Sequence, residues 1–194
     1  MSGYAIGNHL DWRWTDRNLI ITPMFHITGC MYTVTNAVRG STVIYTQFHP
    51  KLIWNVIEKE RITQFMTVPA MLKLMINETD WTEKNIDTLR YIMCGADTVP
   101  PQLIKKFNLY GIEIYHGYGC TEHSGTTTMW TSRMNRDKNH TVGRPFPFTE
   151  VKIMDPLTGK ELPRDTIGEI VFRGPQQFLG YWKNKEETKK VIRN

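Results

Sequence analysis

Short apolar segments alternate with amphipathic segments along the first two thirds of the chain, and this alternation constrains the fold more than any other feature. The short segments are rich in β-branched and aromatic residues, and most are followed directly by Pro or Gly, as is typical of strands. Five such strands are predicted, at residues 19–22, 41–45, 63–68, 89–94 and 112–116.

The amphipathic segments between these strands have the spacing of helices. Apolar residues recur on one face in residues 50–59, 69–77 and 100–109. Strands that alternate with helices through short connections form βαβ units, whose strands lie parallel. The sequence therefore predicts an α/β fold with a parallel or mostly parallel sheet flanked by helices.

The last third of the chain changes in character. Residues 150–154 and 167–172 alternate between apolar and polar side chains, which indicates antiparallel strands. Residues 186–193 have the pattern of a short helix. We expect an α/β subdomain over residues 1–148, the start of a smaller antiparallel β subdomain over 149–182, and a C-terminal helix within 183–194.

Composition and cysteine content exclude several classes of protein. The 194 residues are 40% hydrophobic and 22% charged, which is ordinary for a folded globular chain. The three cysteines, an odd number at wide spacing, favour free thiols in a reducing compartment and show no metal-binding pattern. The sequence has no secretory signal and no apolar run of about 18 residues. We therefore expect a cytoplasmic protein without a transmembrane segment.

The net charge of +5 lies in the second half of the chain. Residues 1–97 carry 9 basic and 9 acidic residues, whereas residues 98–194 carry 15 basic and 10 acidic residues. The lysines near the C-terminus interleave with Glu186 and Glu187, as on a solvent-exposed helix face. Because no nucleic-acid recognition motif accompanies this charge, we expect no nucleic-acid partner.

The predicted parallel sheet also predicts where a ligand would bind. In open α/β sheets, ligands bind beyond the carboxyl ends of the strands. Loops 23–26, 69–70, 95–97 and 117–122 follow such ends, so we expect them to share one edge of the sheet. Their distinctive polar and aromatic groups are His26, Asp97, Tyr118, Thr121 and Glu122.

These groups suit a nucleotide. An aromatic ring can stack on a base, a carboxylate can hold ribose hydroxyls or Mg²⁺, and glycines let the backbone approach phosphate and base closely. Each group also has a structural explanation. His26 can be a structural histidine, Tyr118 can be a core residue and Glu122 can be a surface carboxylate. The glycines can be plain turn residues, and Asp97 can cap the helix near Pro100. Their joint placement at strand ends favours a nucleotide or acyl site.

Five segments, in order along the chain, resemble the motifs of the adenylate-forming enzymes. This superfamily comprises acyl- and aryl-CoA synthetases, the adenylation domains of peptide synthetases and firefly luciferase. Residues 118–122, YGCTE, resemble its Y-G-x-T-E motif. Five ordered matches are highly specific, unlike a lone short motif. The further segments are PMFHITG at 23–29, CGAD at 94–97, VGRP at 142–145, and GEIVFRGP at 168–175 followed by GYW at 180–182.

The resemblance implies that parts of the enzyme lie outside this chain. The family's phosphate loop would precede Ser2, and its T-G-D segment, hinge and C-terminal domain with the catalytic lysine would follow Asn194. We therefore expect a middle fragment of the large N-terminal domain, inactive by itself.

The resemblance also implies a role for each site residue. Tyr118 would stack on adenine, Thr121 would donate to the α-phosphate and Glu122 would ligate Mg²⁺, with Thr121, Glu122 and His26 as the catalytic set. The acyl and CoA pocket would be bordered by His26, Gly117 and Cys120. AMP or ATP would contact Gly95, Ala96, Asp97, His116, Gly117, Tyr118, Gly119, Cys120 and Thr121.

The implied reaction has two halves. A carboxylate attacks the α-phosphorus of ATP to give acyl-AMP and pyrophosphate, and coenzyme A then takes the acyl group and releases AMP. We expect fatty or other apolar acids as substrates. Two alternatives stay open: an adenylation domain or acyl-AMP ligase that loads a carrier protein, and a non-enzymatic nucleotide-binding module.

Overall fold

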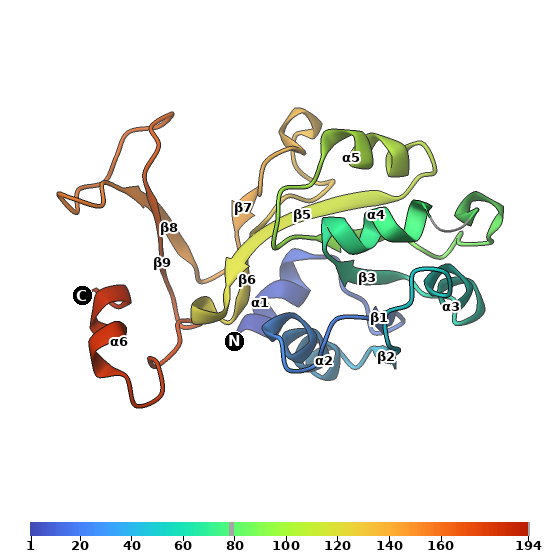
Figure 1. Cartoon of the computed structure of the whole chain (residues 1–194), viewed down its shortest axis with the longest axis horizontal. Helices are drawn as coiled ribbons and strands as arrows, with labels where there is room; N and C mark the ends of the chain where they lie inside the picture. Colours follow the sequence, from blue (N-terminus) through green and yellow to red (C-terminus); the bar gives the residue numbers. More distant parts are fainter. Residues whose placement is uncertain (78–79, 194) are drawn as a thin grey trace.

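Five parallel strands form the larger part of the central sheet, as the alternation of strands and helices predicts (Figure 1). In this computed structural model, which describes residues 1–77 and 80–193, two antiparallel strands complete a seven-stranded sheet of order β2-β1-β3-β4-β5-β6-β7. The strands are β1 (Arg17–Ile20), β2 (Thr42–Tyr45), β3 (Gln64–Thr67), β4 (Tyr91–Cys94), β5 (Glu113–Cys120), β6 (Gly125–Met129) and β7 (Arg144–Pro145).

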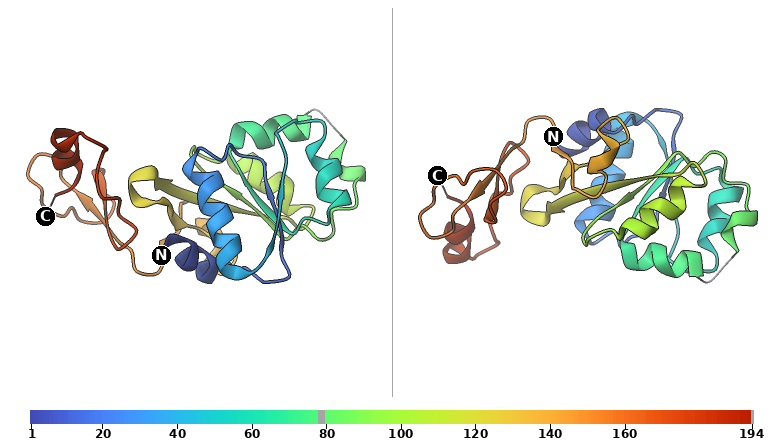
Figure 2. Two further views of the ribbon diagram at one scale, coloured as in Figure 1. Left: turned by 90° about the horizontal axis from the view of Figure 1, so that it is seen from below. Right: turned by 90° about the horizontal axis from the view of Figure 1, so that it is seen from above.

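Helices cover both faces of this sheet (Figure 2). Successive residues of a strand point to opposite sides, and apolar side chains on both sides pack against helices. Ile92 and Cys94 of β4 join an apolar cluster with α3, α4 and α5, whereas Tyr91 and Met93 join a second cluster with α1 and α2. No helix of the described residues is both long and apolar enough to cross a membrane. The helices are α1 (Ser2–His9), α2 (Ile27–Arg39), α3 (Ile53–Lys59), α4 (Pro69–Asn77) and α5 (Pro101–Asn108), with 3₁₀ turns η1 (Trp81–Glu83), η2 (Thr121–His123) and η3 (Arg136–Lys138).

A small unit follows the main sheet and consists of two antiparallel strands and one helix (Figure 1). β8 (Glu150–Met154) pairs with β9 (Glu169–Arg173) in a regular register across all five residues. α6 (Lys185–Val191) is the last element. Every residue of β8 and β9 is at least partly exposed, so the unit has little core of its own.

The strands and helices predicted from the sequence are present, with shifted ends. The helix predicted at 50–59 begins only at Ile53, and the strand predicted at 167–172 is β9. The prediction that Gly117 ends its strand was wrong. β5 continues to Cys120 because β6 pairs with its second half.

The longest helix, α2, was not predicted, and neither were α1, β6 and β7. Its sequence, ITGCMYTVTNAVR, contains six β-branched residues and one glycine, which have low helix propensity. Burial of Met31 and Tyr32 against the sheet supports the helix, and Gly40 ends it in the left-handed conformation at a φ of 65°. Tertiary packing therefore overrides local propensity here.

One buried carboxylate joins the amino ends of β1, β3 and β4. Asp16, only 1% exposed, accepts hydrogen bonds from the Arg13 backbone N–H at 2.7 Å, the Thr63 hydroxyl at 2.9 Å and the Gln64 amide at 3.1 Å. The Arg90 guanidinium donates to the same carboxylate at 2.6 Å and supplies its counter-charge. A buried charge is tolerated only when it is paired and hydrogen-bonded, so Asp16 is a structural residue.

Replacing Asp16 with Ala should lower the free energy of unfolding by about 3 kcal/mol or more, because the groups that donate to its buried carboxylate lose their acceptor. The matched control is Asp87→Ala, which breaks an ion pair with Arg61 whose side chains are 64% and 50% exposed. That change should cost less than about 1 kcal/mol. Urea unfolding followed by tryptophan fluorescence measures both, and equal losses would contradict the special role of Asp16.

Candidate nucleotide site at the carboxyl edge of the sheet

The segments predicted to border a site follow the carboxyl ends of parallel strands. Residues 23–26 come after β1, residues 69–70 after β3 and residues 95–97 after β4, and these strands are parallel neighbours. Residues 117–120 are the end of β5 itself, and η2 follows directly. All four segments therefore lie at one edge of the sheet, as the sequence predicts.

Glycines let the backbones of β4, β5 and β6 approach closely at this edge. A β-carbon at Gly95 would lie 2.7 Å from the carbonyl oxygen of Gly117, and one at Gly119 would collide with the carbonyl oxygen of Gly125. A bulge between Tyr118 and Gly119 bends the strand at the same place. These glycines therefore have a structural role beside the one that the resemblance implies.

Tyr118 stands at the surface of this edge rather than in the core. Its side chain is 39% exposed. The ring lies 5.9 Å from the ring of Phe172 in β9, centroid to centroid, at an angle of 40°. The alternative that Tyr118 is a core residue is therefore wrong, and part of its ring is available to a ligand.

The loop after β4 presents Asp97 to solvent. Ala96 has a φ of 65°, in the left-handed region that residues other than glycine seldom adopt. The exposed carboxylate of Asp97 accepts a hydrogen bond from the N–H of Thr98 at 2.7 Å. α5 begins after Pro100 without a side-chain cap, so the alternative that Asp97 caps this helix is wrong.

His26 has a structural role at the start of α2. Its Nδ1 accepts a hydrogen bond from the N–H of Thr28 at 3.2 Å and so caps the helix. The ring is exposed. Because Nδ1 is an acceptor, a neutral ring carries its proton on Nε2 and keeps one donor for another group.

An apolar groove lies beside Phe25, the residue that precedes His26 in the chain. It has a volume of about 680 Å³ and lies at the carboxyl end of β1. Phe25, which is 94% exposed, borders the groove. The other lining residues are Ile21, Pro23, Met24, Tyr45, Gln47, Phe48 and Met71.

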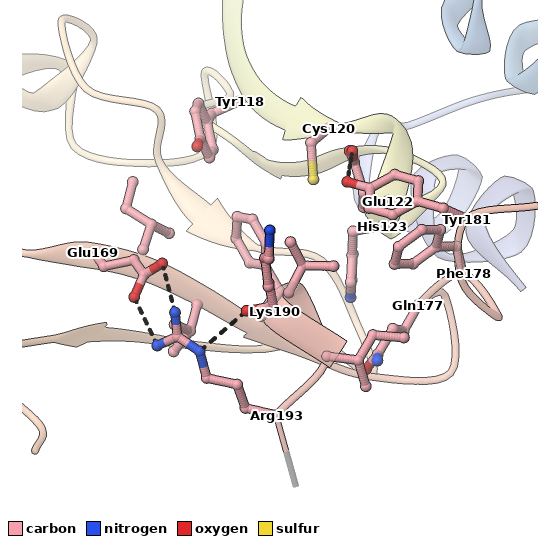
Figure 3. A pocket seen from close by; sticks show the side chains of 15 residues that line it. Tyr118, Cys120, Glu122, His123, Glu169, Gln177, Phe178, Tyr181, Lys190 and Arg193 are labelled. Atoms are coloured by element: carbon pink, nitrogen blue, oxygen red, sulfur yellow. Dashed lines mark hydrogen bonds and ion pairs between the residues drawn. The ribbon is translucent and has the colours of Figure 1, made fainter. Parts of the chain in front are cut away.

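A second cavity, of about 320 Å³, lies between η2 and the small unit (Figure 3). Tyr118, Cys120 and Glu122 line it from the main sheet, and Phe172 and Tyr181 line it from the small unit. The structure thus brings three of the predicted residues together in this cavity. His26 and residues 95–97 lie outside it, elsewhere along the same edge.

At this cavity the Glu122 carboxylate is charged and the Cys120 thiol is neutral. Oε1 of Glu122 accepts a hydrogen bond from the Tyr181 hydroxyl at 2.8 Å, and this bond lowers the pKa of Glu122. Burial raises the pKa of the Cys120 thiol, so the carboxylate is ionised and the thiol protonated at neutral pH. Within residues 1–77 and 80–193, no three His, Cys, Asp or Glu side chains are grouped to hold a metal ion. Glu122 therefore offers a single carboxylate ligand.

Two histidines near the site are buried. His116 is 4% exposed and His123 is 3% exposed, and burial lowers the pKa of both rings. A hydrogen bond to the backbone of Asp97 partly opposes this shift in His116. The carbonyl of His116 accepts a hydrogen bond from the N–H of Trp130 at 2.9 Å, so the residue belongs to the interior of the sheet at this edge.

Sequence reasoning missed Tyr181, His123 and Phe172 as parts of this site. Tyr181 belongs to the GYW segment at 180–182, which was matched to a motif but given no role. Its contact with Glu122 depends on how the small unit docks on η2, and residue spacing does not reveal that arrangement. The GYW segment was the available signal for Tyr181, and the GEIVFRGP segment at 168–175 was the signal for Phe172.

The chain matches the family described as AMP-binding enzyme over residues 1–182 and belongs to that family. The resemblance to adenylate-forming enzymes is thereby confirmed. Similar proteins include YdaB of Bacillus subtilis, provisionally named an acyl-CoA ligase, which is 35% identical over 92% of this chain and 35% of its own length. Feruloyl-CoA synthase of Amycolatopsis is 30% identical over 92% of this chain. Long-chain-fatty-acid–CoA ligase FadD13 of Mycobacterium tuberculosis is 30% identical over 95%.

The chain spans little more than a third of the length of these relatives, 35% to 37%. Among solved structures, the N-terminal domain of FACL13 from Mycobacterium tuberculosis superposes with a TM-score of 0.92 at 29% identity, over 100% of this chain and 49% of that one. O-succinylbenzoate CoA synthetase from Bacillus subtilis, at 24% identity and a TM-score of 0.89, shares the fold. The predicted fold class is confirmed.

The buried histidines should make stability depend on pH. Burial lowers the pKa of His9, His116 and His123 below the ordinary value of 6.5, so the unfolded chain binds more protons than the folded chain. The stabilisation is present above the unfolded pKa of 6.5 and is lost as the pH falls below it towards the lowered pKa of the folded rings. Urea unfolding at pH 7.5 and 5.5 should show the loss.

His116→Asn should reduce this pH dependence, because one of the three contributing rings is removed. The matched control is His140→Asn, at an exposed position, which should retain it. If His116→Asn left the difference in unfolding free energy between pH 7.5 and 5.5 unchanged, the contribution of that ring would be contradicted.

Proposed function

We propose that this chain is part of an ATP-dependent acyl-CoA synthetase, an acid–thiol ligase. The reaction converts a carboxylate and ATP into acyl-AMP and pyrophosphate, and then forms the CoA thioester and AMP. The observation that carries the proposal is the placement of Tyr118, Thr121 and Glu122 together at the carboxyl edge of the sheet, in a chain of the AMP-binding enzyme family.

The residues at this edge can divide the binding of ATP among them. The part-exposed ring of Tyr118 stacks on adenine, and the backbone of Gly95, Ala96 and His116 borders the base. Asp97, with its exposed carboxylate, binds the ribose. The exposed hydroxyl of Thr121 donates to the α-phosphate.

Glu122 fits the role of a Mg²⁺ ligand. Mg²⁺ prefers oxygen ligands and commonly binds one or two carboxylates together with substrate phosphates and water. Glu122 supplies one half-buried carboxylate whose pKa the Tyr181 hydroxyl lowers, which suits a site completed by the nucleotide. When bound, Mg²⁺ would neutralise negative charge that gathers around the phosphorus.

The surroundings of His26 support an apolar acid as substrate. The groove that Phe25 borders is lined mainly by apolar side chains. His26 follows Phe25 in the chain and keeps a donor that can orient a carboxylate. Relatives named for feruloyl-CoA and long-chain fatty acyl-CoA formation support coenzyme A as the thiol. They also weigh against a carrier-protein acceptor or a non-enzymatic module. Free cysteines at 30, 94 and 120 are consistent with a cytoplasmic location.

Glu122→Gln should lower ATP–pyrophosphate exchange by about 10²–10³-fold, because it removes the charge that holds the metal but keeps the shape. The assay uses the complete polypeptide that carries this sequence and a panel of carboxylates. The matched control is Glu161→Gln, in an exposed ion pair with Lys152 of the small unit. Exchange within about threefold of wild type in Glu122→Gln would remove Glu122 from the metal site.

Cys120→Leu should shift substrate preference towards shorter carboxylates, because the resemblance implies that Cys120 borders the acyl group and the larger leucine side chain would take up space there. The measurement is the chain-length profile of pyrophosphate exchange with a series of linear acids. Cys30→Leu, at an exposed position of α2, is the control and should leave the profile unchanged. An unaltered profile in Cys120→Leu would place Cys120 outside the acyl pocket.

A further inference from the structure

The segment between β9 and α6 is fixed onto η2 by three hydrogen bonds. The Ser124 hydroxyl donates to the carbonyl of Gln176 at 2.6 Å, and the N–H of Phe178 donates to the carbonyl of Glu122 at 2.8 Å. The Tyr181 hydroxyl donates to Oε1 of Glu122 at 2.8 Å (Figure 3). This segment therefore holds both the backbone and the side chain of Glu122.

Tyr181 is placed by contacts that do not involve Glu122. Its N–H donates to Oγ1 of Thr188 in α6 at 2.9 Å, and its carbonyl accepts from the N–H of Asn184 at 3.1 Å. The ring packs edge-on against Phe178 with centroids 5.0 Å apart. Because Tyr181 is anchored in this way, its hydroxyl determines where the Glu122 carboxylate lies.

The charge of Glu122 is left for a cation from outside the described residues. Lys190 and Arg193 line the same cavity, but Lys190 pairs with Glu187 at 2.5 Å and Arg193 pairs with Glu169 at 3.0 Å. An ionised carboxylate has two oxygens with about four acceptor positions. The Tyr181 hydroxyl, the Glu122 backbone N–H and the Cys120 thiol account for up to three of them, which leaves one for a metal ion.

We propose that Tyr181 is a positioning residue for Glu122, and that its hydroxyl fixes the carboxylate in the orientation in which it binds the divalent cation accompanying ATP. This inference rests on the proposed function, because it requires Glu122 to be a metal ligand. Partners that orient a metal ligand typically change metal affinity by about 10–100-fold when they are removed. The GYW segment thereby gains a role.

The test measures binding of Mn²⁺, as a paramagnetic substitute for Mg²⁺, to the complete polypeptide in the presence of a non-hydrolysable ATP analogue. Free Mn²⁺ is quantified by electron paramagnetic resonance. Tyr181→Phe should weaken Mn²⁺ binding about tenfold, and Glu122→Gln should weaken it at least as much. The double variant should bind Mn²⁺ no more weakly than Glu122→Gln alone, because Tyr181 acts through Glu122.

Two further variants keep the test decisive. Tyr110→Phe is the matched control, because Tyr110 packs on Trp81 in the main body, and it should leave Mn²⁺ binding unchanged. Thr188→Val removes the acceptor that anchors Tyr181 and should weaken binding in the same direction as Tyr181→Phe. It replaces that variant if Tyr181→Phe does not fold.

Normal Mn²⁺ affinity in Tyr181→Phe, beside a loss in Glu122→Gln, would overturn the positioning role and leave the proposed function intact. Additive losses in the double variant would also overturn it, because they would show that Tyr181 acts elsewhere. If Glu122→Gln itself bound Mn²⁺ normally, the metal assignment and this inference would both fail. Pyrophosphate exchange by the wild type would then still report on acyl-adenylate formation, the first half of the proposed reaction.

Discussion

β5 pairs in parallel with β4 along its first half and antiparallel with β6 along its second half, and the candidate site depends on this change of pairing. The second half extends past the end of β4, so it carries Tyr118 and Cys120 beyond the parallel edge and places η2 farther still. The change requires very close backbone approaches, which Gly95 and Gly119 permit because a β-carbon at either position would meet a carbonyl oxygen. The glycine-rich motif is therefore a requirement of the strand geometry as well as of any ligand.

Carboxylates at the two edges of the sheet differ in whether they are paired with a positive charge. At the amino edge, Asp16 is buried and fully engaged by Arg90 and three hydrogen-bond donors. At the carboxyl edge, Asp97 and Glu122 take part in none of the ion pairs found between described residues. A compensated buried carboxylate stabilises the fold, whereas carboxylates without a counter-charge suit the binding of hydroxyls or a cation. The carboxylate at the amino ends of the strands therefore serves stability, and the carboxylates at the carboxyl ends are available for binding.

The sequence predicts the parallel strands well because their apolar runs are short and punctuated, and it places the site at the correct edge for the same reason. It does not predict α2, whose Gly29 and β-branched residues oppose a helix until Met31 and Tyr32 are buried. It misplaces the end of β5, since Gly117 resembles a turn residue when β6 is not considered. It also gives Tyr181 no role, because the contact with Glu122 joins residues 59 positions apart. What local pattern determines was predictable, and what distant packing determines was not.

The lack of a buried residue in β8 or β9 makes the small unit dependent on its neighbour. Two strands alone are marginally stable in water, and the hydrogen bonds from residues 176, 178 and 181 all meet η2 and Ser124. We therefore expect the unit to open more readily than the main sheet and its amide hydrogens to exchange with solvent sooner. A ligand that orders the turn favours the docked unit by mass action. Protection of the β8 and β9 amides from hydrogen exchange therefore reports whether a ligand is bound at η2.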